Sequence, residues 1–224
     1  MKRALVIVAA GAGSRMGGPL PKQYQELGGK PIIVHTLKQF LRFDPNIEVV
    51  VVLAENHRQM WKAIASKYVS IPGMRLASGG VTRFDSVRNG LDLIEGGRIV
   101  GIHDAVRPFV SRETLERCYD LAAKSGGAIP VIDMEESVRM LEQDSTSVHM
   151  DRTILKRVQT PQVFQSDLIK EAYKNSDHSD YTDDASVYET HFGTIGLVEG
   201  NRQNIKITTP TDMKLASLLI QSAE

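Results

Sequence analysis

The stretch ALVIVAAGAGSRMGG, residues 4–18, is an unbroken apolar run that passes directly into a glycine-rich segment. An apolar run without alternation is typical of a strand that is covered on both faces, as the strands of parallel sheets are. The sequence has three further runs of this kind, at residues 47–53, 99–102 and 128–132. Segments with helical periodicity alternate with these runs and follow them, at about residues 32–42, 56–68, 82–95, 111–124, 166–175, 184–191 and 210–221. We therefore expect an α/β fold, with a mostly parallel sheet and helices on both of its faces.

The composition is that of an ordinary globular protein, and we expect one domain that spans residues 1–224. Hydrophobic residues make up 42% and charged residues 24%, and 27 Lys and Arg residues balance 27 Asp and Glu residues. A net charge of zero provides no broad positive field, so we expect no nucleic acid and no membrane surface as a partner. The first apolar run is far shorter than the ~20 residues of a membrane helix, so we expect a cytoplasmic protein.

Several polar residues have an ordinary structural interpretation. The one cysteine, Cys118, excludes an intramolecular disulfide and argues against a structural zinc site, and we expect it to be buried. The histidines show no metal-ligand spacing, so we expect no metal held by protein side chains. We interpret the acidic group Asp177, Asp180, Asp183 and Asp184 as a solvated loop that leads into a helix N-terminus.

Residues 134–158 interrupt the parallel pattern. Apolar and polar residues alternate there on both sides of the polar segment EQDST, residues 142–146. This pattern predicts an antiparallel hairpin that protrudes as a β-arm. A two-stranded hairpin is marginal alone, so we favour dimerisation through the arm over its packing on its own subunit.

The glycine-rich segment after the first strand predicts a phosphate-binding loop. Glycines at this place let backbone N–H groups approach a phosphate chain closely. A dinucleotide fingerprint would need a third glycine where Met16 stands, and a Walker loop would need Ser or Thr after Lys22, where Gln23 stands. The cations Arg15 and Lys22 favour a polyphosphate site over a simple glycine turn with surface cations.

Two further segments lie where α/β proteins bind ligands. The first, GGVTRFDS at residues 79–86, leads two glycines into a helix whose first turn suits an anion or the edge of a base, although helix capping alone would also explain it. The second, IHDAVRP at residues 102–108, follows the end of a buried strand. Asp104 and Arg107 stand there as opposite charges, and the alternative to a ligand site is a mutual ion pair.

The last two segments are downstream of the hairpin. Asp151 and Arg152 stand before the TPQ sequence at residues 160–162. Residues 204–208, NIKIT, predict a short strand in which alternation points Lys206 away from the core. Taken alone, such a lysine could simply protect a sheet edge.

In order along the chain, the segments at residues 9–16, 21–23, 79–87, 103–108, 160–162 and 204–208 closely resemble the 2-C-methyl-D-erythritol 4-phosphate cytidylyltransferase family. The resemblance implies a Rossmann-like nucleotidyltransferase fold and a homodimer joined by an extended arm. It also implies a step of the isoprenoid pathway that avoids mevalonate. In that step CTP and methylerythritol 4-phosphate give the CDP-linked sugar alcohol and pyrophosphate, with Mg²⁺ held mainly by the CTP phosphates.

The resemblance also assigns roles to residues. It implies that Arg15 and Lys22 stabilise the transition state at the α-phosphate, and that Arg152, from a neighbouring subunit, and Lys206 position the sugar phosphate. It implies further substrate contacts by Asp104, Arg107 and Thr160. It also implies a nucleotide pocket that is formed by Ala9, Ala10, Gly11, Ala12, Gly13, Gly80, Arg83 and Ser86. Segment 130–139 is longer than is usual in the family, and only Ser137 offers a hydroxyl where the family has a substrate-binding threonine.

This chemistry requires cations rather than a base. A phosphate monoester, with a second pKa near 6, is already mostly ionised at neutral pH, so the barrier is repulsion between phosphates. The alternatives are a cytidylyltransferase for ribitol 5-phosphate or another pentitol phosphate, and a nucleotide-binding regulatory protein without turnover. A nicotinamide-dependent reductase is excluded at Met16.

Overall fold

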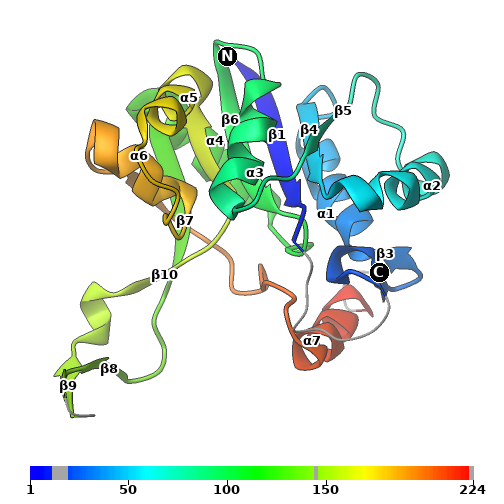
Figure 1. The fold of residues 1–224 in the computed structure, drawn as a ribbon. Coiled ribbons are helices and arrows are strands. Elements are labelled where there is room, and N and C mark those ends of the chain that lie inside the picture. Colours follow the sequence, from blue (N-terminus) through cyan, green and yellow to red (C-terminus); the bar gives the residue numbers. More distant parts are fainter. Residues whose placement is uncertain (12–19, 144–145, 222–224) are drawn as a thin grey trace.

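The computed structural model describes residues 1–11, 20–143 and 146–221. Its centre is an eight-stranded sheet (Figure 1). Seven strands follow the order β10-β7-β11-β6-β1-β4-β5, and the eighth, β12, also pairs with β7. The strands are β1 Lys2–Ala9, β4 Glu48–Leu53, β5 Arg75–Ser78, β6 Arg98–Asp104, β7 Gly127–Asp133, β10 Lys156–Val158, β11 Gln162–Gln165 and β12 Gly196–Glu199. β10 and β11 run antiparallel to their neighbours, and the other pairs are parallel. The predicted mostly parallel sheet is therefore confirmed.

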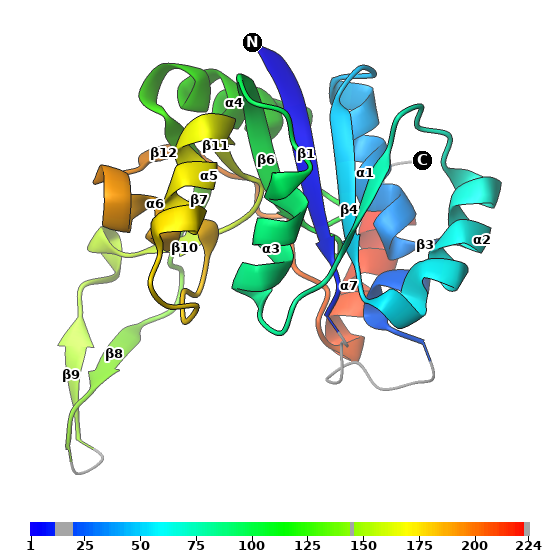
Figure 2. The same ribbon diagram turned by 45° about the horizontal axis from the view of Figure 1, so that its top comes forward.

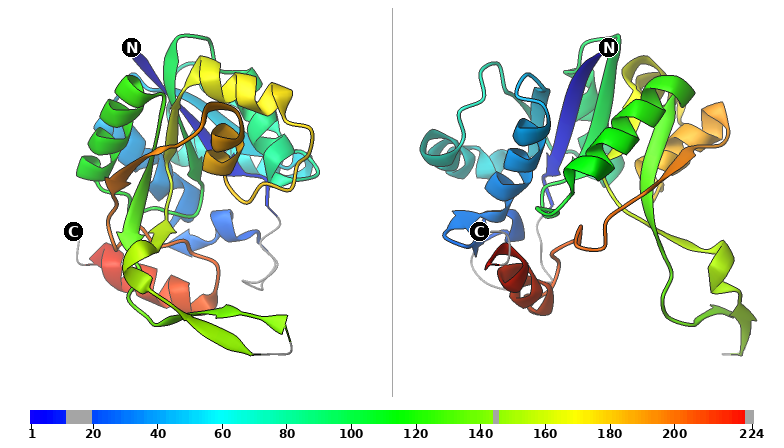
Figure 3. Two further views of the ribbon diagram at one scale, coloured as in Figure 1. Left: turned by 90° about the vertical axis from the view of Figure 1, so that its left-hand side faces the viewer. Right: turned by 180° about the vertical axis from the view of Figure 1, so that it is seen from behind.

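Helices cover both faces of the sheet, as predicted (Figures 2 and 3). They are α1 Ile32–Phe43, α2 Arg58–Tyr68, α3 Arg83–Asp92, α4 Arg112–Ser125, α5 Ser166–Asn175, α6 Asp184–Phe192 and α7 Pro210–Gln221. Alternate residues of β1 serve the two faces: Leu5 and Ile7 pack with α1, α2 and α4, whereas Ala4 and Val6 pack with α3, α5 and α6. Each strand is thus buried on both sides, which explains why its sequence is apolar without alternation.

The predicted helices match the observed ones within three residues at each end. Cys118 is buried in the core, as predicted, and Trp61 of α2 lies in the same cluster. The short strands β5, β10, β11 and β12 were not predicted. The expected strand at residues 204–208 is wrong, because this segment has no regular structure. Its Ile207 is nevertheless fully buried, and the Ile207 N–H donates a hydrogen bond to Val106 O at 3.0 Å.

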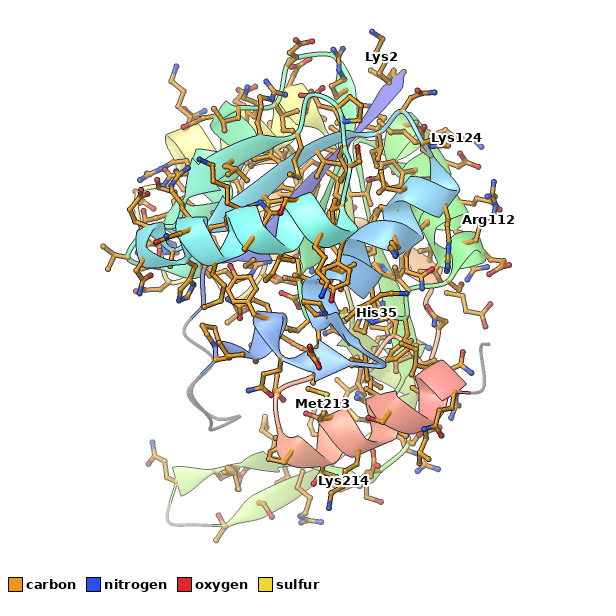
Figure 4. All side chains as sticks on the ribbon, turned by 90° about the vertical axis from the view of Figure 1, so that its right-hand side faces the viewer. Lys2, His35, Arg112, Lys124, Met213 and Lys214 are labelled. Carbon is orange, nitrogen blue, oxygen red and sulfur yellow. The ribbon has the colours of Figure 1, made fainter. Side chains whose placement is uncertain are left out.

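The C-terminal helix α7 closes one end of the molecule. It packs with the small hairpin of β2 Glu26–Leu27 and β3 Lys30–Pro31, around a cluster that includes Leu27, Ile207 and Ala216. Figure 4 shows α7, which carries Met213 and Lys214, beneath the α1 helix that carries His35. None of the described helices is long and apolar enough to cross a membrane.

The predicted arm is an antiparallel hairpin of β8 Val138–Leu141 and β9 Ser147–Met150, which projects away from the sheet (Figures 1 and 2). The boundary at residue 158 needs correction, because β10 pairs with β7 in the central sheet. The chain therefore leaves the sheet after β7 and rejoins it at Lys156. Met140 and Leu141 of the hairpin, and Ile154 of the short 3-10 turn η5, Arg152–Ile154, are half or more exposed. Residues 144–145, between the two strands in the sequence, lie outside the described residues.

Candidate functional site

A cavity of about 350 Å³ opens at the carboxyl ends of β1 and β6. Parallel α/β sheets bind their ligands at this end of the strands. The cavity is lined by Val8, Ala9, Ala10, Gly11, Lys22, Gln23, Gly80, Val81, Thr82, Arg83, Ser86, Asp104, Ala105, Val106 and Lys206. Four segments that the sequence analysis singled out separately, around residues 9–11, 22–23, 80–86 and 104–106, thus meet at one place together with Lys206.

The end of β1 is tied to the segment that carries Lys22. Gln23 is buried, and its Nε2 donates hydrogen bonds to Ala9 O at 2.7 Å and to Gly11 O at 3.3 Å. This side chain anchors the 3-10 turn η2, Lys22–Tyr24, against the strand end, so Lys22 lines the cavity. The role of Gln23 was missed, because nothing in the local sequence indicates its contact with Ala9, 14 positions away.

Three predicted site residues, Arg15, Ala12 and Gly13, lie outside the described residues. Their expected role at the α-phosphate and in the nucleotide pocket therefore stays a prediction. Gly11 and Lys22, which stand before and after this segment in the sequence, both line the cavity.

The N-terminus of α3 forms a second wall of the cavity. Thr82 caps the helix: its side chain accepts from the Asp85 N–H at 3.1 Å, and the Asp85 carboxylate accepts from the Thr82 N–H at 3.1 Å. The Gly80 N–H donates to Ser86 Oγ at 3.0 Å. A Cβ on Gly80 would lie 2.1 Å from the Cβ of Asp85, so only glycine fits there. Capping and a ligand-facing helix start are thus both present, and neither excludes the other.

Arg83 is held at the cavity wall by an acidic residue of α6. Its Nη1 and Nη2 donate to the two carboxylate oxygens of Asp184 at 2.8 and 2.6 Å. Burial lowers the pKa of Arg83, but the charge and hydrogen bonds of Asp184, together with the charges of Asp104 and Tyr173, outweigh burial and raise that pKa above its usual value. Asp184 is fully buried, so its interpretation as part of a solvated loop is wrong.

Asp104 gathers two cations at the opposite wall. Its Oδ2 accepts from Lys206 Nζ at 3.0 Å and from Arg107 Nε at 3.2 Å. Burial would raise the pKa of Asp104, yet Lys206, Arg107 and Arg83 together hold it below its usual value. The ion pair between Asp104 and Arg107 that we considered as an alternative is present, but Lys206 shares the same oxygen.

Arg107 and Thr160 support the cavity rather than line it. Arg107 Nη1 donates to the Asn204 carbonyl at 2.7 Å, which fixes the irregular segment before Lys206. Thr160 is buried, and its Oγ1 accepts from the Asp104 N–H at 3.2 Å and lies 3.0 Å from His103 Nδ1. Both residues were predicted as substrate contacts, and the structure places them one layer behind Asp104.

His103 connects this network from within the core. Its Nε2 lies 3.0 Å from the Arg107 carbonyl, and burial lowers its pKa to about 4. A neutral ring can donate from Nε2 to that carbonyl only if Nδ1 accepts the Thr160 proton. The Thr160 hydroxyl then donates to His103 and accepts from the Asp104 N–H, and these two hydrogen bonds hold the loop after β6 in place.

The arm residues lie apart from the cavity of their own chain. Arg152 is exposed on the short turn η5, Arg152–Ile154, and bonds to the Glu135 carbonyl oxygen. Ser137 is also exposed. Neither residue is among those that line the cavity of the described chain.

A cavity lined by cations, backbone and a helix N-terminus, at the carboxyl end of a Rossmann-like sheet, defines the nucleotide-binding α/β class. The family model described as IspD, 2-C-methyl-D-erythritol 4-phosphate cytidylyltransferase, matches residues 3–222. The chain belongs to this family of nucleotidyltransferases, as the sequence resemblance predicted.

The relatives match this chain over nearly its whole length. The 2-C-methyl-D-erythritol 4-phosphate cytidylyltransferases of Bacteroides thetaiotaomicron and Bacteroides fragilis are 46% and 48% identical over 220 residues, which cover 98% of this chain and 100% of each relative. Among solved structures, 4-diphosphocytidyl-2C-methyl-D-erythritol synthase from Anaerococcus prevotii has a TM-score of 0.85 at 28% identity, with coverage of 98% and 96%. The Thermus thermophilus cytidylyltransferase has a TM-score of 0.79 at 30% identity, with coverage of 99% and 100%.

Proposed function

We propose that the protein transfers the cytidylyl group of CTP to 2-C-methyl-D-erythritol 4-phosphate. The products are 4-diphosphocytidyl-2-C-methyl-D-erythritol and pyrophosphate, on the non-mevalonate route to isoprenoids. The observation that carries the proposal is the meeting of Lys22, Arg83 and Lys206 with the backbone at Gly11 and Gly80 around one cavity. Family membership over residues 3–222 supports the same reaction.

In the proposed reaction, a phosphate oxygen of the sugar phosphate attacks the α-phosphorus of CTP. A new P–O bond forms while the bond to the β-phosphate oxygen breaks, and that electron pair leaves with pyrophosphate. The nucleophile is already ionised at neutral pH, so positioning and charge neutralisation supply the catalysis. We propose that Lys22 and Arg15 neutralise the charge that develops at the α-phosphate, and that Lys206 binds the phosphate of the incoming sugar phosphate.

Lys206 suits this role because Asp104 holds it at the cavity. Its Nζ lies 3.0 Å from Asp104 Oδ2, while its side chain remains 41% exposed. An ammonium group has three donors, so it can keep the carboxylate and still bind a phosphate. Arg107 and Thr160 hold the loop that presents Asp104.

We propose that Mg²⁺ enters with CTP, held mainly by its phosphates. The described residues contain no group of three or more His, Cys, Asp or Glu side chains that could hold a metal ion. Asp104 is the one carboxylate among the described lining residues, and its Oδ2 is engaged by Lys206 and Arg107. Mg²⁺ commonly binds through substrate phosphates with few protein ligands, and it would neutralise charge on the triphosphate.

We propose that the functional unit is a homodimer joined by the arm, with Arg152 placed in the cavity of the neighbouring subunit. Exposed apolar residues on the arm, such as Leu141 at 79% and Ile154 at 73%, support an interface there. CTP and sugar phosphates are metabolites of the cytoplasm, which is where we expect the protein to act.

A pyrophosphate-release screen tests the proposed function. The protein with Mg²⁺ is given each of the four ribonucleoside triphosphates together with either methylerythritol 4-phosphate or ribitol 5-phosphate. We expect release only with CTP, and at least about a hundredfold higher kcat/KM with methylerythritol 4-phosphate, since unpaired polar groups penalise the wrong polyol. Faster turnover of ribitol phosphate would support the alternative cytidylyltransferase, and no release with any pair would indicate a binding protein.

A further inference from the structure

The pair of Arg83 and Asp184 joins residues 101 positions apart in the chain. Both guanidinium donors are matched to both carboxylate oxygens, which is the geometry that fixes an arginine most firmly. Asp184 is fully buried, whereas 30% of the Arg83 side chain is exposed, and Arg83 lines the cavity. Asp184 is therefore a buried anchor, and the partly exposed guanidinium of Arg83 faces the cavity.

Tyr173 of α5 completes the anchor. Its Oη donates to Asp184 Oδ1 at 2.6 Å, and its ring stacks on Phe84 with 4.5 Å between centroids. Tyr181 stacks on the same Phe84 ring at 5.8 Å. Because Phe84 follows Arg83 in α3, this stack fixes the tyrosine hydroxyl relative to the helix that carries the arginine.

Gln162 places Asp184 from the sheet. Its Oε1 accepts from the Ala185 N–H at 2.7 Å, and its Nε2 donates to Asp183 Oδ2 at 2.8 Å. Asp183 caps α6 by accepting from the Ser186 N–H at 3.0 Å. The buried amide of β11 thus holds the first turn of α6, and with it the carboxylate that grips Arg83.

We propose that Asp184 and Tyr173 are positioning residues for nucleotide binding, which hold the Arg83 guanidinium against the CTP phosphates or ribose. The proposal rests on the proposed function, in which the α3 N-terminus is part of the nucleotide pocket. A guanidinium has five N–H donors, and Asp184 takes two of them. The exposed remainder of the group is oriented toward the cavity before any ligand arrives, so binding does not have to order this side chain.

The first test replaces one oxygen of the anchor. Asp184→Asn keeps the size of the side chain but removes its charge and half of the bidentate acceptor. We expect the Kd of Mg-CTP, measured by calorimetry without sugar phosphate, to rise by at least about tenfold, since charge-assisted pairs are the stronger hydrogen bonds. KM for CTP should rise similarly, whereas kcat and KM for the sugar phosphate should change by less than threefold.

Glu189→Gln is the matched control, because it makes the same acid-to-amide change at an exposed position of α6, outside the contacts that hold Asp184. It should leave the Kd of Mg-CTP within twofold. Tyr173→Phe removes only the hydroxyl and keeps the aromatic stack, and it should raise that Kd about threefold. This variant also keeps the test decisive if Asp184→Asn does not fold.

A double-mutant cycle separates positioning from general stability. In an Arg83→Met background, Asp184→Asn should change the Kd of Mg-CTP by less than twofold, because Asp184 acts only through Arg83. An equal loss in both backgrounds, or an unchanged Kd in Asp184→Asn and Tyr173→Phe, would overturn the proposal. The Kd is read without turnover, so absence of the transfer reaction would contradict the proposed function and leave this result standing.

Discussion

At the scale of single residues, the site depends on where a few cations are held. Lys22 is placed by its neighbour Gln23, Lys206 by Asp104, and Arg83 by Asp184. In each case a buried polar side chain holds the cation in place. This arrangement suits a reaction whose barrier is electrostatic, because fixed charges need no reorganisation as charge develops.

Lys22→Ala tests this at the reacting phosphate. Loss of one preorganised donor typically costs about 3–4 kcal/mol, so we expect kcat to fall roughly a hundred- to a thousandfold with the fold intact. Steady-state pyrophosphate release gives kcat, and circular dichroism checks the fold. Lys124→Ala, on the exposed face of α4 (Figure 4), is the control. A fall of less than fivefold for Lys22→Ala would remove this residue from the catalytic role.

Local spacing made some of these residues predictable and left others hidden. Gly11 and Lys22 follow the first strand and Gly80 stands just before a helix, so position alone pointed to these three lining residues. Asp184 was missed because its partner is 101 residues away and their contact depends on how α6 docks. An acidic residue in the first turn of a helix is common, so nothing in the local sequence distinguished it.

At the scale of elements, a buried polar network links the end of β6 to the segment that precedes its neighbour β11. His103, Thr160 and the loop from Asp104 to Arg107 are linked by hydrogen bonds around the buried imidazole. The pKa of His103 is about 4 in the folded protein, below its ordinary value of 6.5. The unfolded chain therefore binds more protons between pH 6.5 and pH 4, and folding loses stability as the pH falls through this range.

We expect His103 to contribute about 3 kcal/mol of unfolding free energy that is lost between pH 7.5 and pH 4. Urea unfolding of the wild type and of His103→Gln at several pH values measures it. The variant should be less stable at pH 7.5 and should lose correspondingly less on acidification. His149→Gln, on the exposed arm, should follow the wild type. Parallel stability curves for wild type and His103→Gln would contradict the assignment.

Helices were predictable to within a few residues, whereas short strands were not. The helices span 9 to 14 residues, and three of them begin after a capping residue: Thr82 before α3, Ser111 before α4 and Asp183 before α6. Strands β5, β10, β11 and β12 have only three or four residues, too few to show a period. The strand expected at residues 204–208 was suggested by Ile205 and Ile207, which instead pack with α7 and Val106 without pairing in a sheet.

At the scale of the whole molecule, the arm separates one predicted substrate residue from the cavity of its own chain. Arg152 sits on η5 beside the hairpin, whereas Lys22 and Lys206 line the cavity at the end of the sheet. In the proposed homodimer, each site takes Arg152 from the neighbouring subunit. Two defective subunits can then build one complete site between them.

Mixing Lys22→Ala with Arg152→Ala subunits tests this arrangement. After unfolding and refolding at equal concentrations, half of the dimers are mixed, and each mixed dimer holds one site with both residues intact. We expect about a quarter of the wild-type activity, well above either variant alone. If Arg152 serves its own subunit, mixing restores nothing beyond the average of the two variants.

The account as a whole holds that fixed positive charges, without a proton-transferring side chain, bring two phosphates together. The pH dependence of kcat/KM for the sugar phosphate, between pH 5 and pH 9, tests this most directly. We predict one ionisation near pH 6, that of the sugar phosphate, and a plateau above it. A phosphonate analogue of the substrate, whose second pKa is higher, should move that midpoint upward. A midpoint that stays in place when the substrate is changed would assign the ionisation to a protein base and contradict the account.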